Sequence, residues 1–215
     1  MSTCRLDHLV ITAPTLEVGE DYVEQLLGDR PTRGGVHERM ATHNSLLSLG
    51  DSIYLEVIAV IPGEAPPPHP RWFALDALPA DAPPRLATWV VRCDDIRAAV
   101  AASPVPLGEI VPMRRGGLEW LITIPSDGQL PMDGTLPAVI QWTRGQHPAA
   151  RLGRSGCSLT SLEVRHPEAG RIRSILSAIG FHETRLDIRV GVGEAACCLA
   201  AIQTPAGVRW IGTGQ

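Results

Sequence analysis

One order of secondary-structure elements repeats along this sequence, and the repeat limits what the chain can fold into. Residues 6–11 are apolar and β-prone, which predicts a strand. Apolar residues between 15 and 27 share one helical face, and runs at 42–49 and 52–60 read as the two strands of a hairpin. With a short strand before the hairpin, the first sixty residues predict the order βαβββ.

The same order restarts twice. A strand at 86–92 precedes a helix that ends near Ala102, and three strand-like runs follow, at 108–113, 118–124 and 137–142. A weaker third round begins at Cys157 and again reads as strand, helix and three strands. Repetition at this scale predicts a protein assembled from copies of one small unit.

The boundaries between rounds are marked by composition. Residues 61–85 contain eight prolines, a composition that suits a connector running over a surface. We therefore expect an α+β fold with a first module at 1–60, the connector at 61–85, a second module at 86–150 and a third at 151–215.

Charge and composition exclude several classes of function. All 19 basic residues are arginine, so Schiff-base chemistry and the lysine of a nucleotide-binding loop are excluded. A net charge of -4 argues against nucleic acid or an anionic membrane as the partner. The start of the chain lacks an apolar signal core, and the five cysteines form no CxxC pair. We expect a cytoplasmic protein with reduced thiols that binds a small molecule.

Polar residues recur at matching points of the apolar strands. His8 in the first strand matches Thr88 in the second module, and Glu56 in the closing strand of the hairpin matches Gln141. Polar groups inside otherwise apolar strands need partners, so their recurrence indicates that these side chains face a shared cavity.

Several stretches carry a resemblance to a known family: LDHLVITAP at 6–14, GGVHERMATHNSLLSLG at 34–50 with YLEVIAV at 54–60 behind it, PRWFALD at 70–76, and LPAVIQW at 136–142 with HPAARL at 147–152. They resemble the vicinal oxygen chelate superfamily, which includes glyoxalases, bleomycin-resistance proteins and extradiol dioxygenases, and within it the glyoxalase-like domain proteins. The resemblance implies that two βαβββ modules form a curved, mixed-sheet trough.

The resemblance also implies a divalent metal (Zn, Fe, Mn, Ni or Mg) on four ligands, one from the first and one from the last strand of each module. The residues at the matching positions are His8, Glu56, Thr88 and Gln141. Histidine and glutamate are sound ligands, whereas threonine is a poor one and a glutamine amide a weak one. Thr88 and Gln141 are therefore also candidates for substrate contact.

His43 is a candidate third ligand. If Gly50-Asp51 is a two-residue hairpin turn, Ser45 faces Glu56, and His43 lies on the same face as that carboxylate. A three-residue loop would reverse His43 to the other face. The other interpretation is that His43 only fixes the entry of the hairpin.

Glu56 and His37 are the candidates for the catalytic step. Glu56 can serve as the catalytic carboxylate, or it can be a buried hydrogen-bonding partner of His8 without a metal. His37 is expected on a loop rim, as a gate or proton donor or as a solvated surface residue.

Arginine and tryptophan side chains are candidates for substrate binding. Arg92 shares strand parity with Thr88 and can hold a carboxylate or phosphate, unless it pairs with a nearby aspartate. Trp89 is a candidate ligand contact, although tryptophans such as those of this chain are more often core residues than ligand platforms. The pair Arg114-Arg115 reads as a solvated loop.

Two functions remain open at this point. The first is a metal-dependent glyoxalase-like enzyme of lyase, isomerase or dioxygenase type, acting on a small oxygen-rich substrate. The second is a metal-free protein of the bleomycin-resistance type that binds or sequesters a small molecule. The third module is expected either to cover the open side of the trough or to make the contact of a homodimer.

Overall fold

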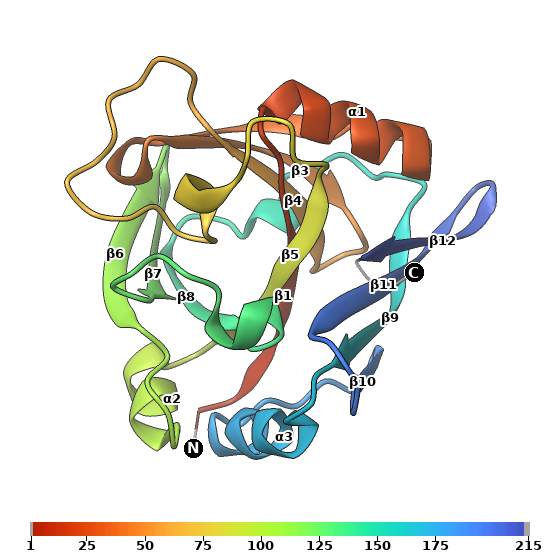
Figure 1. Cartoon of the computed structure of the whole chain (residues 1–215). Coiled ribbons are helices and arrows are strands. Elements are labelled where there is room, and N and C mark those ends of the chain that lie inside the picture. Colours follow the sequence, from red (N-terminus) through yellow and green to blue (C-terminus); the bar gives the residue numbers. More distant parts are fainter. Residues whose placement is uncertain (1, 213–215) are drawn as a thin grey trace.

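A computed structural model describes residues 2–212 (Figure 1). The elements of the first module are β1 (Cys4–Thr12), α1 (Leu16–Leu27), β2 (Thr32–His37), β3 (Thr42–Ser48) and β4 (Tyr54–Val60). The Thr15 hydroxyl accepts a hydrogen bond from the backbone N–H of Val18 at the start of α1, and Gly28 ends the helix in the left-handed conformation. The predicted order βαβββ is present.

The second and third modules repeat this order. The second contains β5 (Arg85–Cys93), α2 (Ile96–Ala102), β6 (Glu109–Arg115), β7 (Leu118–Ile124) and β8 (Ala138–Arg144). The third contains β9 (Ser158–Arg165), α3 (Ala169–Ala178), β10 (Asp187–Gly191), β11 (Cys197–Thr204) and β12 (Gly207–Gly212). Short 3-10 helices lie at Glu38–Met40, Leu75–Ala77, Pro131–Gly134 and Pro148–Ala150. None of the helices described within residues 2–212 has the length and apolar character that a membrane crossing requires.

The first two modules share one curled sheet. Its strand order is β2-β3-β4-β1-β5-β8-β7-β6, with β1 and β5 antiparallel at the centre. The sheet curls until its edge strands β2 and β6 come into contact, which turns its inner face into a trough (Figure 1). The α+β fold with repeated modules and a curved mixed sheet is confirmed.

The third module forms a separate sheet on the outer face of the curled one. Its strand order is β10-β9-β11-β12, and β11 and β12 contact β5. Leu162 and Ile202 of this module pack in one cluster with Trp89 and Val91 of β5. Val90 and Val10 belong to a different cluster, on the inner face of the curled sheet. The third module therefore lies behind the trough and does not cover its open side.

The proline-rich connector closes the inner side. Trp72, Phe73 and Leu75 are buried there against Val10 and Val90 of the central strands. The segment is pinned by Arg71, which donates to the carboxylate of Asp76 over 2.6 Å and to the carbonyl of Met40 over 3.1 Å. The inner face of the sheet is thus enclosed by strands on one side and by the connector on the other.

Candidate functional site

The trough encloses a small aromatic cavity of about 20 Å³, room for a single water molecule. Residues of β1, β4, the connector and β6 to β8 meet there. The lining is formed by His8, His37, Tyr54, Glu56, Trp72, Phe73, Arg115, Trp120, Ile122, Ile140 and Trp142. His8 and Glu56, which belong to different strands, therefore face a common cavity.

A β-bulge brings a second acidic residue to this site. Between Leu6 and His8 the register of β1 against β5 shifts, because Leu6 opposes Val91 while His8 opposes Val90. Asp7 is the extra residue, and a bulge re-aims a side chain that strict alternation would send to the other face. The fully buried Asp7 carboxylate accepts a hydrogen bond of 2.6 Å from His8 Nδ1.

Two further donors hold the same carboxylate. Trp142 Nε1 donates to Asp7 Oδ2 over 3.0 Å, and His147 Nε2 donates to the same oxygen over 2.9 Å. Burial raises the pKa of Asp7, but the hydrogen bonds from His147 and His8 outweigh it and hold this pKa well below its usual range. Asp7 is therefore a buried, ionised anchor for the His8 ring.

His8 lies between two carboxylates. Its Nε2 is 3.5 Å from Glu56 Oε2, and its ring stacks on Tyr54 with the ring centroids 4.5 Å apart. Burial lowers the pKa of His8, yet the hydrogen bonds and charges of Asp7 and Glu56 raise it to about 9. His8 is consequently an imidazolium at neutral pH, with the proton on Nε2 facing Glu56 at the cavity wall.

Glu56 is ionised and fixed in place. Asn44 Nδ2 donates to Glu56 Oε1 over 2.5 Å, which leaves Oε2 toward His8. Burial raises the pKa of Glu56, but the hydrogen bond and charge of His8 reverse this and bring it to about 2. The carboxylate therefore keeps its charge although only 6% of the residue is exposed.

The expected two-residue hairpin turn is wrong. Leu46 rather than Ser45 opposes Glu56, because Gly50, Asp51 and Ser52 together form the loop and Leu49 bonds to Ile53 across it. The one-residue shift exchanges the faces of β3. Asn44 therefore lies beside Glu56, and the metal-ligand set of His8, His43 and Glu56 is not assembled.

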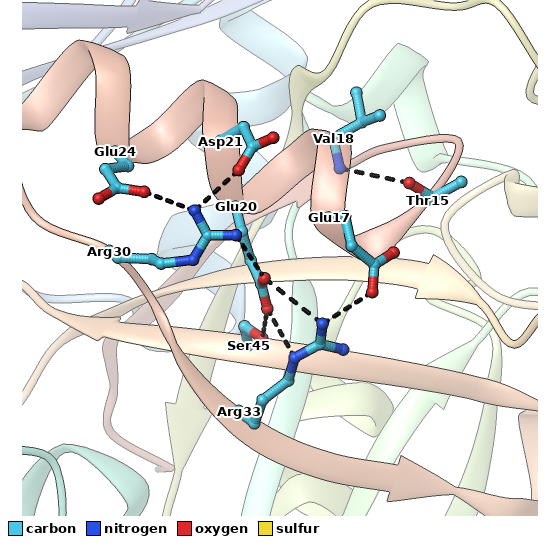
Figure 2. A network of polar contacts seen from close by, with 9 residues as sticks. All are labelled: Thr15, Glu17, Val18, Glu20, Asp21, Glu24, Arg30, Arg33 and Ser45. Carbon is cyan, nitrogen blue, oxygen red and sulfur yellow. Dashed lines mark hydrogen bonds and ion pairs between the residues drawn. The ribbon is translucent and has the colours of Figure 1, made fainter.

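The other face of β3 points toward α1. Ser45 donates to the buried carboxylate of Glu20 over 2.5 Å, and Arg33 Nε lies 2.9 Å from the same carboxylate (Figure 2). His43 shares this face. Burial lowers the pKa of His43, and the charges of Glu17 and Glu20 on α1 act in the opposite direction. These contacts hold α1 against the hairpin and lie away from the cavity.

His37 ends β2 and is buried, not on a loop rim as expected. Its ring meets Trp72 and Trp120 edge-on, with centroid separations of 5.0 and 6.0 Å. Arg115 donates to His37 Nε2 over 3.2 Å, so Nδ1 carries the proton and lies 3.2 Å from the Thr42 hydroxyl. Burial lowers the pKa of His37 to about 3, and the ring is therefore neutral.

The candidates from the second module lie elsewhere. The Thr88 hydroxyl donates to the Gly134 carbonyl over 2.9 Å, and the Gln141 amide bonds to Ile96 and Asp94 at the start of α2. Trp89 is buried on the outer face and donates to the Thr135 carbonyl over 2.9 Å. The structure does not bring these three side chains to the cavity of His8 and Glu56.

Arg92 lies behind the site. Its guanidinium donates to the Ser52 carbonyl over 2.8 Å and is 3.6 Å from Asp7 Oδ2, so it supports the buried aspartate. The expected pairing with Asp94 or Asp95 is absent from the ion pairs of residues 2–212. With these partners, Arg92 is not free to hold a ligand.

Comparison with known proteins identifies the family of this chain. The family model described as the glyoxalase-like domain matches residues 6–180, which is most of the chain. The chain belongs to this family. The resemblance to the glyoxalase-like domain proteins noted in the sequence is thereby confirmed. A search of curated protein sequences finds no match.

Three solved structures are similar to this glyoxalase-like protein, and the first shares its fold. A hypothetical protein from Staphylococcus aureus is 15% identical, with a TM-score of 0.62 over 90% of this chain and 88% of that chain. Methylmalonyl-CoA epimerase from Mycobacterium tuberculosis is 16% identical, with a TM-score of 0.43 over 67% and 91% of the two chains. The Mn(II)-bound glyoxalase from Novosphingobium aromaticivorans is 11% identical, with a TM-score of 0.48 over 99% and 83%.

A divalent metal does not fit the donors of this glyoxalase-like site. A catalytic metal usually has three or more protein ligands. Only His8 and Glu56 offer metal-binding atoms from the superfamily positions, because the Thr88 hydroxyl is engaged and Ile140 and Trp142 replace the amide of Gln141 in the cavity. Within residues 2–212 no group of three histidine, cysteine or acidic side chains is arranged to hold a metal.

Four residues of the site escaped sequence reasoning: Asp7, Asn44, Arg115 and His147. The sequence did not predict Asp7 because the β-bulge that turns it inward was not foreseen, and it did not predict Asn44 because the hairpin loop is one residue longer than expected. His147 follows β8 in a stretch that belongs to the family resemblance, which was its only signal. Arg115 could not be predicted because its contact with His37 forms only when the edge strands β2 and β6 meet.

The glycine pair Gly34-Gly35 makes room for two of these residues. A Cβ at Gly34 would clash with Asn44 Oδ1, and one at Gly35 would lie 3.0 Å from the Arg115 side chain. Gly35 also has a φ of 146°, which other residues rarely adopt. The pair therefore lets Asn44 and Arg115 pack against β2.

The Gly34→Ala variant is expected to lower the free energy of unfolding by about 1–3 kcal/mol, because the added methyl group displaces Asn44 from Glu56. Urea denaturation measures this difference. Gly117→Ala is the matched control, since no atom lies within 4 Å of a Cβ there. Equal stability of the two variants would show that Gly34 has no special packing role.

Proposed function

We propose that this protein is a glyoxalase-like enzyme of isomerase or lyase type that moves a proton on a small oxygen-rich molecule. The observation that carries the proposal is the buried row of Asp7, His8 and Glu56, in which an imidazolium lies between two carboxylates at the wall of a cavity. Such a row supports general acid–base chemistry, because one group can give a proton while its neighbour accepts one.

Each residue has a defined role in this proposal. His8 Nε2–H donates a hydrogen bond to a carbonyl oxygen of the substrate, and Glu56 accepts a proton from the carbon beside that carbonyl. The C–H bonding pair becomes the C=C bond of an enol, and the oxygen takes the proton of His8. Asp7 holds the ring and stabilises its positive charge.

Substrate binding would also make Glu56 a better base. In the free protein, the hydrogen bond and charge of His8 hold the pKa of Glu56 at about 2. A carbonyl oxygen that accepts the Nε2–H hydrogen bond of His8 removes this hydrogen bond from the carboxylate, and the pKa of Glu56 then rises. The superfamily's metal is not used in these steps, because the donors present do not fit it.

A metal-free binding protein is the second candidate. It is favoured by the aromatic wall of Trp72, Trp120 and Trp142, which can hold an organic molecule without chemistry. The two functions differ in a measurable way, since a binding protein leaves the C–H bonds of its ligand intact.

Proton exchange in D₂O, followed by ¹H NMR, tests the proposed function. Protein treated with a chelator is incubated with small carbonyl compounds that carry hydrogen on the neighbouring carbon. We expect deuterium to enter at that carbon at an unchanged rate with or without chelator. Binding without exchange would support the second candidate, and exchange that requires an added divalent ion would overturn the proposed steps.

A further inference from the structure

Two neighbouring arginines at the end of β6 have different environments. Arg114 projects outward with 83% of its side chain exposed, and its nearest carboxylate, on Glu38, is 3.9 Å away. Arg115 is half-buried, lines the cavity and donates to His37 Nε2 over 3.2 Å. Arg114 is therefore solvated as predicted, but both arginines belong to β6 and not to a loop.

Arg115 lacks a counterion in the part of the chain that the structure describes. No carboxylate of residues 2–212 forms an ion pair with it, whereas Arg71 and Arg92 have Asp76 and Asp7. Among residues 2–212, Arg115 has one polar partner, the neutral ring of His37. The other carboxylate of the cavity, Glu56, is already held by His8 and Asn44. A half-buried guanidinium without an anion is costly, so an anion is the missing partner.

Arg115 also lies at the mouth of the cavity. It lines both the aromatic cavity and an open cleft of about 500 Å³ between β2 and the turn from β6 to β7. The stem of its side chain runs across Gly35, where any other residue would obstruct it. An anion bound to Arg115 would therefore sit in the open cleft at its boundary with the cavity. Because the cavity has room for one water molecule, the rest of the ligand would have to move the aromatic wall apart to reach His8 and Glu56.

We propose that Arg115 binds the carboxylate of the substrate, and that the substrate class is the small α-oxo carboxylates. This inference rests on the proposed function, which requires a carbonyl beside a C–H bond. A guanidinium fork matches a carboxylate, and one Arg115 nitrogen is already engaged by His37. Arg33 and Arg151 also line the cleft but not the cavity, so Arg115 is the arginine that reaches the cavity of His8 and Glu56, and the phosphate arm of the test separates the two anions.

The test uses pyruvate and its uncharged analogue diacetyl, in which a methyl ketone replaces the carboxylate. Binding is followed by fluorescence of Trp72, Trp120 and Trp142, which line the cavity. The Arg115→Gln variant should weaken pyruvate binding about tenfold to a hundredfold and leave diacetyl binding unchanged. Arg114→Gln, the matched control, should alter neither, and Arg115→Lys should restore part of the loss.

Three results would overturn the inference. The first is that the Arg115 and Arg114 variants weaken pyruvate binding equally. The second is that inorganic phosphate binds more tightly than pyruvate, and the third is that the tryptophan fluorescence of the wild-type protein does not change with pyruvate up to roughly 100 mM.

Deuterium exchange separates this inference from the proposed function. One outcome is that diacetyl exchanges its hydrogen for deuterium at equal rates with the wild type and with Arg115→Gln, while pyruvate binds both proteins equally well. In that case the proposed function stands and the carboxylate site fails. If pyruvate binds through Arg115 but neither compound exchanges, the carboxylate site stands and the proposed function fails.

Discussion

The Glu56→Gln variant is expected to lose about two to four orders of magnitude in the rate of deuterium exchange, while binding of the same carbonyl compound changes little. Glutamine has the shape of glutamate, and its amide oxygen can still accept the hydrogen bond of Asn44. It cannot accept a proton from carbon. The rate is measured by ¹H NMR in D₂O, and binding by tryptophan fluorescence.

The control for this variant is Glu119→Gln, which removes a carboxylate whose side chain is 51% exposed and paired with Arg144. Its exchange rate should equal that of the wild type. If Glu56→Gln exchanges as fast as the control, Glu56 is not the base, and the role assigned to the buried row must be abandoned.

The Asp7→Asn variant is expected to lose about 3–5 kcal/mol of unfolding free energy at neutral pH. Asp7 accepts hydrogen bonds from His8, His147 and Trp142, all of them donors. The amide group of asparagine turns a donor toward some of them and removes the closer of the two buried carboxylates beside the His8 imidazolium. Urea denaturation gives the difference, with the exposed Asp21→Asn as the control, expected to change stability by about 0.5 kcal/mol or less.

The pH dependence of stability should change in the same variant. The pKa of His8 is raised in the folded protein, so its stabilising effect is complete below about 6.5 and is lost as the pH rises through about 9. Without Asp7 the folded pKa of His8 falls toward the unfolded value, and this loss of stability becomes smaller. Identical alkaline profiles for wild type and Asp7→Asn would contradict a charged His8–Asp7 pair.

Much of the fold follows from the sequence because it depends on local signals. Alternating apolar residues, helix ends such as Thr15 and Gly28, and the repeat itself predict the elements and their order. The proximity of His8 and Glu56 also follows, since both are polar interruptions of neighbouring strands; in the parallel register His8 opposes Tyr54 and Glu56 opposes Val10, which puts both side chains on one face.

The rest of the site depends on shifts of one residue that the sequence does not reveal. One extra residue in β1 turns Asp7 inward, and one extra residue in the hairpin loop replaces His43 with Asn44. In β8, Trp142 opposes Trp120 in the cavity wall, so Gln141 faces outward. A side-chain period of two makes each of these shifts an exchange of faces.

The central claim is that His8 is a buried imidazolium held between Asp7 and Glu56. Its most direct test is a pH titration of the His8 ring nitrogens by ¹⁵N NMR in the wild-type protein. Both nitrogens should carry protons at neutral pH, with a midpoint of about 9. A neutral ring at pH 7, titrating near the ordinary value of 6.5, would contradict it.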